Sequence, residues 1–596
     1  MSGLRKSYDV VVVGAGWFGL VAAKASKQLN PEAKMVVLEA AESCGGTWSR
    51  NRWFGLAAAK AYIELHPNDK VLVIEAESTV GGTWSKDRLY PGLKSNNLWG
   101  SYEYPDFPMS EEIYGVGYGQ HIPAAVLHRY LTDFSKAFGV FDCIRFNTRV
   151  EAIECTSGGG WKLQVSNSKS GSDNAVFETE KLIVATGLTS EPNLPRYEGQ
   201  ETFTSEFFHA KDFCRKADVL KTAKSAVVVG AGKSAFDCAY ACAVEGSASV
   251  HLVIRPTGEG PVWLAPPFVT PFKRMMEELL STRLLTWFSP TIWGAEDGYG
   301  MARGFLHGTG IGNFLVGNFW NTLSSDVVQA HGYNDHPEVF KLKPWQNAMW
   351  TGSGVGIHNF DSNFFDLVRA GKIHVHLADI NSVRDNKIRL SNGETIETDV
   401  VICATGWKKD PATKILNFDT GLKVQGAERE KLIAEADEQV LSSLPLLKDQ
   451  PVLRHEVKKG EPLRNYRYIV PTQAVFNRNI AYAGMVSTVT TSIFATVQGL
   501  WISAFLDGKL NRSPKDDTTV VKETILHTQW NKWRYPCGYG ASLPDFAFDS
   551  IPYVDMLLKD LGLRNHRKAT DLAEIVEPYK PKDYKGLVEE WAGLHK

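Results

Sequence analysis

The chain has 596 residues, of which 43% are hydrophobic and 22% charged, a composition that suits a globular protein of two or three domains. Its 65 basic and 67 acidic residues leave a net charge of −2, which argues against nucleic acid or another polyanion as a partner. The eight cysteines contain no CxxC pair, no run of about 18 apolar residues is present, and a strand within ten residues of Met1 leaves no room for a signal peptide. We therefore expect reduced thiols, no spanning helix and a cytoplasmic protein.

A dinucleotide-binding unit is the first predicted element. Residues 10–13 read as a buried strand, 20–29 as a helix and 34–39 as a second strand that ends in Glu39. Between the first strand and the helix stands a G-x-G-x-x-G turn formed by Gly14, Gly16 and Gly19. Such a turn brings the backbone and a helix N-terminus to a pyrophosphate, and the acid accepts hydrogen bonds from the ribose. Because that acid repels a 2′-phosphate, the unit favours the adenosine of FAD.

Most of this unit occurs twice. Residues 17–52 return as 53–88 with 20 of 36 positions identical, and the second copy carries its own acid, Glu75. Only Gly16 leads covalently into the first copy, so we expect that copy to supply the helix and favour Glu39 over Glu75 at the ribose. The unused copy would then be a surface insertion, left by a tandem duplication or by two joined exons.

A Gly-Gly-Thr-Trp sequence closes each copy and is a further candidate contact. Two glycines let the chain run close to a bound cofactor, and tryptophan offers a flat apolar surface. The second of these sequences is continuous with the loop that follows at 90–108, so we consider it the better placed. Its candidate cofactor residues are Gly82, Thr83 and Trp84.

The next predicted elements are a helix at 122–138 and a hairpin at 150–154 and 161–165. A buried strand that begins at Lys181 then ends in a turn of small residues. We expect this turn, formed by Ala185, Thr186 and Gly187, to lie at the same cofactor.

A second strand–glycine–helix unit begins at Ala226. Its turn and the start of its helix contain Gly230, Gly232, Lys233, Ser234 and Ala235. Its second strand, 249–254, ends in Arg255 instead of an acid. A guanidinium pairs well with a 2′-phosphate, so this unit predicts NADPH in preference to NADH.

The remaining residues contain less specific sequence signals. Residues 257–347 form an aromatic-rich insertion for which a lid, a substrate wall, a peripheral membrane contact and a packed loop-rich subdomain are all open. A second strand that ends in Ala-Thr-Gly at 400–406 is expected to return the chain to the first domain. A strand at 480–484 precedes a turn rich in serine and threonine and then a helix at 493–506, whose hydroxyl-rich start and Gln498 are candidates for the flavin. Charge-mixed helices run from there to Lys596, with Trp530 as a packing anchor.

Together these motifs resemble the flavin-containing monooxygenase family, within the class B flavoprotein monooxygenases. The resemblance covers most of 8–255 and about 395–510. It includes the family signature F-x-G-x-x-x-H-x-x-x-Y/W at 203–213, in which Ser205 replaces glycine, Phe213 replaces the last aromatic residue and His209 keeps the histidine. The resemblance implies that His209 has a catalytic role.

The loop at 90–108 looks like the active-site loop of the same family. Asn96 falls where the family has an asparagine that contacts the flavin and the retained nicotinamide. The resemblance implies FAD and NADPH as cofactors, with FAD forming a C4a-(hydro)peroxyflavin that oxygenates a lipophilic small molecule at nitrogen or sulfur, as in N,N-dimethylaniline monooxygenation. Dioxygen is the co-substrate, and neither a metal cluster nor a catalytic triad is found in the sequence.

The expected fold is α/β with two Rossmann-like domains and a helical C-terminal region. We expect the FAD-binding domain at 1–215 and 407–510, an inserted NADPH-binding domain at 216–406, and a helical extension at 511–596. Sequence alone indicates no oligomeric state.

Three other functions are weighed against this one. A Baeyer–Villiger monooxygenase would have Trp-Pro at the end of the signature, where Phe213 and Cys214 stand, and an acid in place of Asn96. A flavoprotein impaired by the duplication would lack bound flavin. A disulfide reductase would need a cysteine pair near the flavin, whereas Cys238 and Cys242 lie one turn apart on the second predicted helix.

Overall fold

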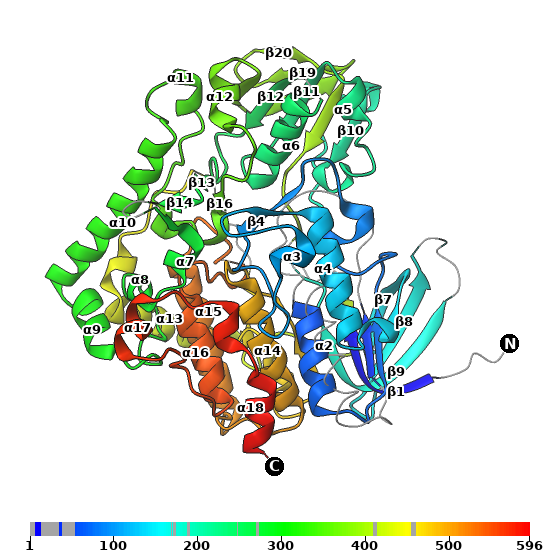
Figure 1. The fold of residues 1–596 in the computed structure, drawn as a ribbon, viewed down its shortest axis with the longest axis vertical. Coiled ribbons are helices and arrows are strands. Elements are labelled where there is room, and N and C mark those ends of the chain that lie inside the picture. The colour runs from blue at the N-terminus through cyan, green and yellow to red at the C-terminus, as the bar shows by residue number, and fades with distance from the viewer. Residues whose placement is uncertain are drawn as a thin grey trace.

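A mixed sheet, a parallel sheet and a layer of helices make up the described structure (Figure 1). The computed structural model describes residues 6–13, 35–38, 54–168, 170, 174–187, 191–246, 248–269, 273–408, 414–454, 461–540 and 542–595. The first glycine turn, with Gly14, Gly16 and Gly19, and the acid Glu39 lie outside these residues. The predicted fold class, two Rossmann-like domains with a helical C-terminal region, is confirmed.

The first sheet stands at the lower right of Figure 1. Within the described residues its order is β2-β3-β1-β9-β8-β7-β22, with β25 beside β9 and β6 beside β3. Its strands are β1 (Lys6–Val13), β2 (Met35–Leu38), β3 (Val71–Ile74), β6 (Ile144–Arg145), β7 (Thr148–Cys155), β8 (Trp161–Asn167), β9 (Ala175–Val184), β22 (Lys414–Leu416) and β25 (Ile480–Tyr482). The strands that pair in parallel, β1, β3, β9 and β25, are rich in valine, leucine and isoleucine, which is typical of parallel strands covered on both faces. Since β22 and β25 follow the second domain in the chain, the first domain is discontinuous, as predicted.

The second copy of the repeat supplies the strand beside β1. Val10 pairs with Val71 and Val13 with Ile74, whereas β2, from the first copy, pairs with β3. Helix α2 (Phe54–Leu65) is also from the second copy, and its residues from Phe54 to Glu64 are buried. Among the described residues, the helix and the strand that pack beside β1 therefore come from the second copy, whereas the helix expected at 20–29 of the first copy lies outside these residues. Helix α2 and strand β3 make one continuous helix–strand unit on the sheet and against α14 (Thr491–Leu506).

Contact between α2 and α14 is unusually close. A Cβ atom on Gly499 would lie 2.4 Å from the carbonyl oxygen of Ala57, so only glycine allows the two backbones to approach. A side chain on Gly484, in the turn after β25, would likewise collide with Phe54 at 2.3 Å. The second copy is thus fitted to elements that lie more than 400 residues along the chain.

The second sheet forms the top of the molecule in Figure 1. Its order is β10-β21-β11-β12-β17, and all its neighbouring strands are parallel. The strands are β10 (Glu206–His209), β11 (Ser225–Val229), β12 (Ser249–Ile254), β17 (Ile373–Leu377) and β21 (Val400–Cys403). One face packs on α5 (Val219–Thr222), α6 (Lys233–Val244) and α12 (Phe364–Arg369), and the other on β18 (Ile380–Arg384), β19 (Lys387–Leu390) and β20 (Thr395–Glu397). Because β10 belongs to this sheet, the second domain begins before the expected boundary at 216.

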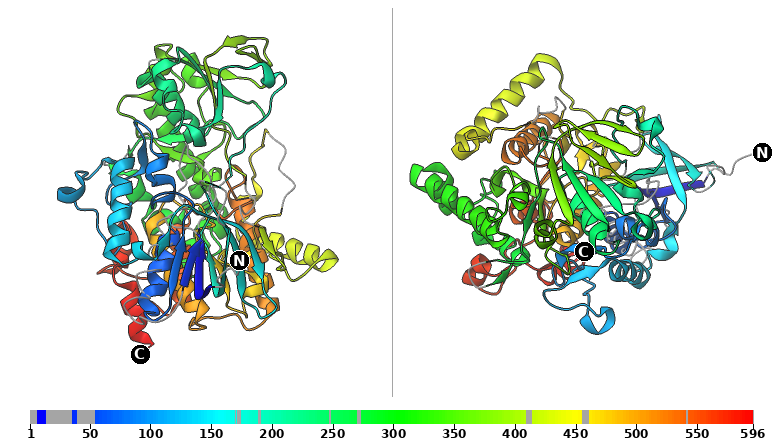
Figure 2. Two further views of the ribbon diagram at one scale, coloured as in Figure 1. Left: turned by 90° about the vertical axis from the view of Figure 1, so that its right-hand side faces the viewer. Right: turned by 90° about the horizontal axis from the view of Figure 1, so that it is seen from above.

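The aromatic-rich insertion and the C-terminal extension form one layer of helices at the lower left of Figure 1. Its helices are α7 (Met276–Leu280), α8 (Arg283–Trp287), α9 (Gly300–Gly308), α10 (Gly310–Ala330), α15 (Asp517–Arg534), α16 (Ser550–Asp560), α17 (Asp571–Val576) and α18 (Leu587–Leu594). Helix α13 (Gly426–Ser443) packs on α15, whereas α11 (Pro337–Phe340) lies at the top of Figure 1 beside α12. Arg283 joins the two segments, since its buried guanidinium forms ion pairs with Asp555 and, at 2.6 Å, with Glu574. Trp530 is fully buried and donates a hydrogen bond to the Pro290 carbonyl at 2.9 Å. Figure 2 shows α13, in yellow, projecting from the edge of this layer.

Short strands connect these three parts. They are β4 (Lys94–Leu98), β5 (His121–Pro123), β13 (Trp263–Ala265), β14 (Phe268–Val269), β15 (Arg274–Met275), β16 (Val355–Ile357), β23 (Asn465–Tyr466) and β24 (Val470–Pro471). Helices α3 (Glu111–Tyr114) and α4 (Ala124–Ala137) lie beside β4 and β5, and α4 confirms the helix predicted at 122–138. In the part of the chain that the structure covers, no helix is long and apolar enough to cross a bilayer.

Candidate active site

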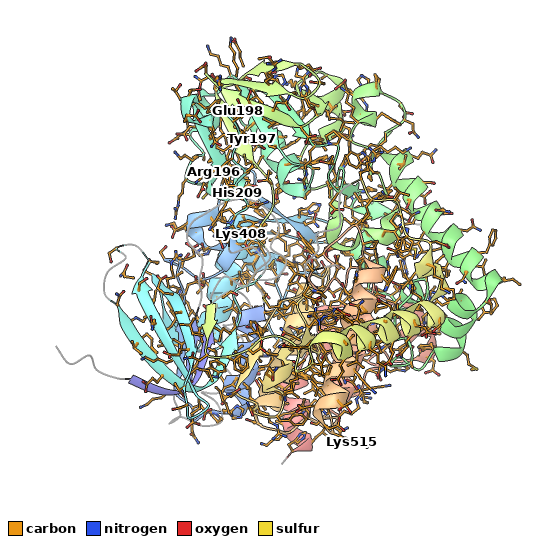
Figure 3. All side chains as sticks on the ribbon, turned by 180° about the vertical axis from the view of Figure 1, so that it is seen from behind. Arg196, Tyr197, Glu198, His209, Lys408 and Lys515 are labelled. Carbon is orange, nitrogen blue, oxygen red and sulfur yellow. The ribbon has the colours of Figure 1, made fainter. Side chains whose placement is uncertain are left out.

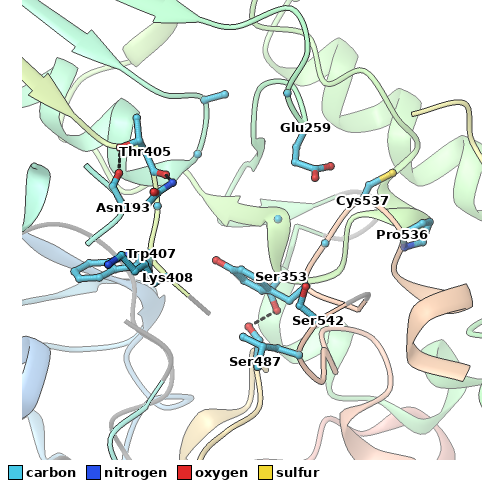
Figure 4. Close-up of a pocket in the computed structure, with 18 of the residues that line it drawn as sticks. Asn193, Glu259, Ser353, Thr405, Trp407, Lys408, Ser487, Pro536, Cys537 and Ser542 are labelled. Atoms are coloured by element: carbon cyan, nitrogen blue, oxygen red, sulfur yellow. Dashed lines mark hydrogen bonds between the residues drawn. The ribbon is translucent and has the colours of Figure 1, made fainter. Parts of the chain in front are cut away.

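A cavity of about 1720 Å³ lies between the second sheet, β4 and the helical layer. Its wall contains Asn96 of β4, the glycine turn after β11 and the turn after β21. In Figure 4, Asn193, Thr405, Trp407 and Lys408 stand on one side, and Ser353, Ser487, Ser542 and Cys537 on the other. The cavity therefore brings together residues that are far apart in the chain, from Asn96 through the turn at 230–234 to the turn at 404–406.

The glycine turn after β11 is shaped by close backbone packing. Gly230 has φ 144°, and a Cβ atom there would lie 2.4 Å from the carbonyl oxygen of Ala404. Gly232 caps α6 at its N-terminus, and a Cβ atom on it would meet nothing within 4 Å. The turn thus leaves free space in front of the first turn of α6, whose backbone N–H groups and partial positive charge suit a phosphate. This fits the pyrophosphate of a dinucleotide.

Lys233 begins α6 and lines the cavity, but its ammonium group is held by the protein. It forms an ion pair with Asp237 one turn along the helix and donates to Asn359 Oδ1 at 2.8 Å. It also lies 4.2 Å from the centre of the Phe360 ring. Burial lowers the pKa of Lys233, and Asp237 opposes that effect. The side chain therefore anchors the turn to the segment after β16.

Arg255 directly follows β12, and its exposed side chain lines the same cavity as the glycine turn. The glycine turn precedes α6, which leads into β12, so both ends of the predicted nucleotide unit face one space. A guanidinium at this position can receive a 2′-phosphate with bidentate geometry.

Asn96 is 3% exposed and lines the cavity. Its Oδ1 accepts a hydrogen bond from the backbone N–H of Ile357 at 2.6 Å. Because an N–H can only donate, this bond fixes which end of the amide is the oxygen. The amide nitrogen is left for a partner in the cavity, and β16 links it structurally to the segment that holds Lys233.

His209 does not line the cavity, and its two ring nitrogens are both engaged. Nδ1 accepts from the Lys211 backbone N–H at 3.1 Å, so the ring proton lies on Nε2, which donates to the Gly406 carbonyl at 3.0 Å. Burial lowers the pKa of His209 to about 4. Its ring packs edge-on against Trp407, with centres 5.2 Å apart. Figure 3 shows His209 and Lys408 between the two sheets, and we assign His209 as a neutral positioning residue for the turn at 404–406.

Residues expected at the flavin lie around the carboxyl ends of β3 and β9. Glu75 directly follows β3, is fully buried, and accepts from the Glu77 backbone N–H at 2.9 Å. Ala185, Thr186 and Gly187 directly follow β9, which pairs with β1, and Gly187 has φ 68°. The carboxyl ends of parallel strands are where an α/β fold binds nucleotides.

The second Gly-Gly-Thr-Trp forms a short 3₁₀ turn at Gly82–Trp84. Gly81 has φ 115°, and a Cβ atom there would lie 3.0 Å from the Trp84 backbone, so the turn requires glycine. The Thr83 hydroxyl and the Trp84 indole nitrogen are buried with no hydrogen-bond partner among the described residues. Buried polar atoms normally have a partner, so this turn fits a polar ligand such as FAD.

Both ends of the Gln498 amide form hydrogen bonds within the protein. Gln498 is 1% exposed, its Oε1 accepts from the Gly484 backbone N–H at 3.2 Å, and its Nε2 donates to the Tyr553 hydroxyl at 3.0 Å. These bonds hold the turn after β25 against α16, so we assign Gln498 to the support of that turn.

The residues on the opposite wall of the cavity were not predicted from the sequence. Ser353, Ser487 and Cys537 come from segments that are more than 45 residues apart, and they meet here. The serine- and threonine-rich turn at 487–492 was the one visible signal. Ser353 lies in a Gly-Ser-Gly segment, and this local sequence by itself indicates no function.

Comparison with known proteins gives the family and the fold. Residues 75–290 match a family model described as flavin-binding monooxygenase-like, and residues 12–52 match one described as NAD(P)-binding Rossmann-like domain. The chain is 30% identical to the FAD-dependent monooxygenase rstn6 of Aspergillus nomiae over 98% of both chains. It is 32% identical to a FAD-dependent monooxygenase of Pyrenophora dematioidea, over 95% of this chain and all of the other. Among solved structures, cyclohexanone monooxygenase from Rhodococcus sp. Phi1 bound to NADP+ is similar in fold, with a TM-score of 0.57, 15% identity, and 94% and 98% of the two chains covered.

Proposed function

This chain belongs to the family of FAD-dependent monooxygenases, and we propose that it uses NADPH and dioxygen to oxygenate a lipophilic small molecule at nitrogen or sulfur. The observation that carries the proposal is one cavity lined by Asn96, by the turn at 230–234 and by Arg255. A reaction between a bound nicotinamide nucleotide and a second reactant needs these groups to face one space.

FAD would be held by the first nucleotide unit. Gly14, Gly16 and Gly19 would receive its pyrophosphate, and we favour Glu75 over Glu39 for its ribose because β3 is the strand beside β1. Gly82, Thr83 and Trp84, with Ala185, Thr186 and Gly187, would complete this site. The chemistry that FAD supplies when bound is the redox activation of dioxygen, which amino-acid side chains do not provide.

NADPH would be held by the second unit. The start of α6, with Gly230, Gly232, Ser234 and Ala235, would face its pyrophosphate, and Arg255 would pair with its 2′-phosphate. Asn96 would donate its amide N–H groups into the cavity, since Ile357 already occupies its oxygen. Apolar side chains such as those of Trp263, Val355 and Leu543 line the cavity, suit a lipophilic substrate and exclude water.

Product analysis tests this function. The purified protein should carry a yellow flavin and consume NADPH and dioxygen with a panel of one amine, one thioether and one ketone. We expect an N-oxide and a sulfoxide as products. Ester formation from the ketone alone would contradict oxygenation at nitrogen or sulfur.

The second candidate is a Baeyer–Villiger monooxygenase. What favours it is the fold similarity to cyclohexanone monooxygenase over 94% of this chain. Against it stands Phe213, which is fully buried against the Tyr90 ring, with centres 5.0 Å apart, where that class has Trp-Pro. An impaired flavoprotein is the third candidate, and a colourless protein would favour it.

We also propose that the α9–α10 hairpin rests on a membrane surface. Met301 is 93% exposed, Ile311 70% and Phe314 67%. Between 301 and 325 the only ionisable side chains are Arg303 and His307, and both are buried. An exposed apolar patch without charge suits the interface of an electrically neutral bilayer.

A further inference from the structure

A chain of hydroxyl groups on one wall of the cavity ends at a buried carboxylate. Ser487 and Ser353 both line the cavity, and the dashed line in Figure 4 joins their hydroxyl groups. Behind them lies Asp545, which is fully buried. The inference drawn from these three residues rests on the proposed function, because it concerns the substrate of the same cavity.

The carboxyl group of Asp545 accepts hydrogen bonds from this wall. Its Oδ2 accepts from the Ser353 backbone N–H at 2.8 Å, and its Oδ1 accepts from the Ala547 backbone N–H at 3.2 Å. Backbone N–H groups can only donate, so both oxygens of Asp545 act as acceptors. The Ser353 hydroxyl also donates to Oδ1, at 2.8 Å.

The donor–acceptor direction of these hydrogen bonds also determines the role of the Ser487 hydroxyl. Since Ser353 uses its proton on Asp545, its oxygen is an acceptor, and the Ser487 hydroxyl donates to it at 2.5 Å. A hydroxyl has one proton and two lone pairs. The Ser487 oxygen at the cavity surface has therefore used its proton, and it presents lone pairs only.

The wall is also rigid. Ser487 is held at both backbone groups, because its N–H donates to the Pro544 carbonyl at 2.8 Å and its carbonyl accepts from the Phe546 N–H at 2.8 Å. Gly352 has φ 52°, and a Cβ atom there would lie 2.4 Å from Asp545 Oδ2. The acceptor is thus fixed in place before a ligand arrives, which is how a binding site discriminates between ligands.

We propose that Ser487 accepts a hydrogen bond from an O–H or N–H group of the substrate. The cavity then selects lipophilic molecules that carry such a donor over analogues in which the donor is methylated. A fixed acceptor that meets a methyl ether loses its partner, and a site built around a polar group rejects such analogues strongly. Ser487 is a specificity-determining residue in this account.

A matched pair of probes tests the proposal. We choose 4-(methylthio)phenol and 4-methoxythioanisole, which differ in one methyl group and share the same thioether. Calorimetric titration of the flavin- and NADP+-loaded protein measures binding of each probe without any turnover. We expect the phenol to bind about tenfold more tightly than the methyl ether, the value of one net hydrogen bond.

Three variants separate the hydroxyl chain from a general effect of the wall. Ser487→Ala should bring the ratio of the two affinities close to one. Ser353→Ala should also bring this ratio close to one, but by raising the affinity for the methyl ether. The Ser487 hydroxyl is then free to donate a hydrogen bond to the ether oxygen. Ser542→Ala removes a hydroxyl that lines the same cavity but does not belong to the hydrogen-bonded series Ser487–Ser353–Asp545. This variant should keep the tenfold ratio.

The proposal is overturned if the wild type does not prefer the phenol, or if Ser487→Ala keeps the preference. It is also overturned if Ser487→Ala weakens binding of NADP+ itself, since the donor would then belong to the nucleotide. If the ratio behaves as expected while neither thioether is oxidised, the inference stands and the proposed function fails.

Discussion

Val10 of the first strand pairs with Val71 of the second copy of the repeat, across a gap of 61 residues. We infer from this pairing that the second copy is the one that the protein needs. Deletion of 17–52 joins Gly16 to Trp53, which restores the sequence Gly-Ala-Gly-Trp-Phe-Gly in front of α2. We expect this shortened chain to fold and to bind FAD at least as well as the full chain, as measured by flavin absorbance after gel filtration.

Deletion of 53–88 should be harmful. The first copy would then take the place of α2 and put Lys27 where the fully buried Ile63 stands, and Ser26 where Tyr62 stands. Loss of the buried aromatic and burial of a lysine should lower the free energy of unfolding by at least about 3 kcal/mol. Equal stability of the two deletion variants in urea would contradict the assignment of the second copy.

The close approach of Gly230 to Ala404 gives the second prediction. Gly230→Ala has no room for its methyl group and is strained at φ 144°, so it should both destabilise the second domain and abolish tight NADP+ binding. Gly232→Ala is the matched control, because its methyl group meets no protein atom within 4 Å. It should leave thermal stability unchanged and still weaken NADP+ binding at least about tenfold, since the methyl group occupies the space of the pyrophosphate. Unchanged NADP+ binding in Gly232→Ala would place the nucleotide elsewhere.

Arg255 gives the third prediction. A guanidinium–phosphate contact is worth about 1.5–3 kcal/mol, so Arg255→Gln should lower the preference for NADPH over NADH by about 10- to 100-fold in kcat/KM. Lys408→Gln removes another exposed cation that lines the cavity and should leave the preference unchanged. An equal loss of activity with both nucleotides in Arg255→Gln would mean that the arginine does not contact the 2′-phosphate.

Local patterns predict much of this fold because they act over short distances. The valine-rich strand at 225–229 and the small residues after it define a strand, turn and helix within 20 residues, and the structure contains all three. The choice between two similar copies is not local. It depends on packing against distant elements, such as the close contact of α2 with α14 at Gly499 and Ala57, and no pattern within residues 17–88 reveals that contact.

In the candidate site, too, some residues are predictable from local motifs and others are not. Gly230, Arg255 and Asn96 are marked by their own motifs, and one cavity joins them. The motif around His209 carries less information, because two backbone contacts that make it a neutral support, with Lys211 and Gly406, are visible only in three dimensions. The wall formed by Ser353, Ser487 and Asp545 is harder to predict from the sequence, because these residues come from three segments that meet only in the folded protein.

The α9–α10 hairpin gives the fourth prediction. We expect the protein to sediment with vesicles of phosphatidylcholine, and the double variant Ile311→Ser, Phe314→Ser to do so at least about tenfold more weakly, because two exposed apolar side chains would no longer enter the lipid. Leu572→Ser, which changes a 69% exposed leucine on α17, is the matched control and should bind like the wild type. A hairpin variant that only changes a dimer into a monomer would show that a second copy covers this face.

His209 gives the last prediction, which concerns pH. The pKa of His209 is about 4 in the folded protein because burial disfavours the charged ring, and about 6.5 in an unfolded chain. Between these values the unfolded state binds more protons, so the stability from the neutral ring is complete above pH 6.5 and is lost as the pH falls toward 4. The loss should reach about 2 kcal/mol at pH 5. Since the ring is neutral between pH 5 and 8, it should contribute no ionisation to the pH profile of kcat/KM.

Comparison of the wild type with His209→Gln checks both statements. Glutamine cannot ionise, so urea unfolding at pH 8 and pH 5 should show a smaller loss of stability in the variant than in the wild type. That difference isolates His209 from the other buried histidines, whose contribution is common to both proteins. The variant should keep the same pH dependence of kcat/KM, with at most a lower rate from a displaced turn at 404–406. If instead one limb of that profile disappears in His209→Gln, the histidine takes part in proton transfer and is more than a support for Gly406.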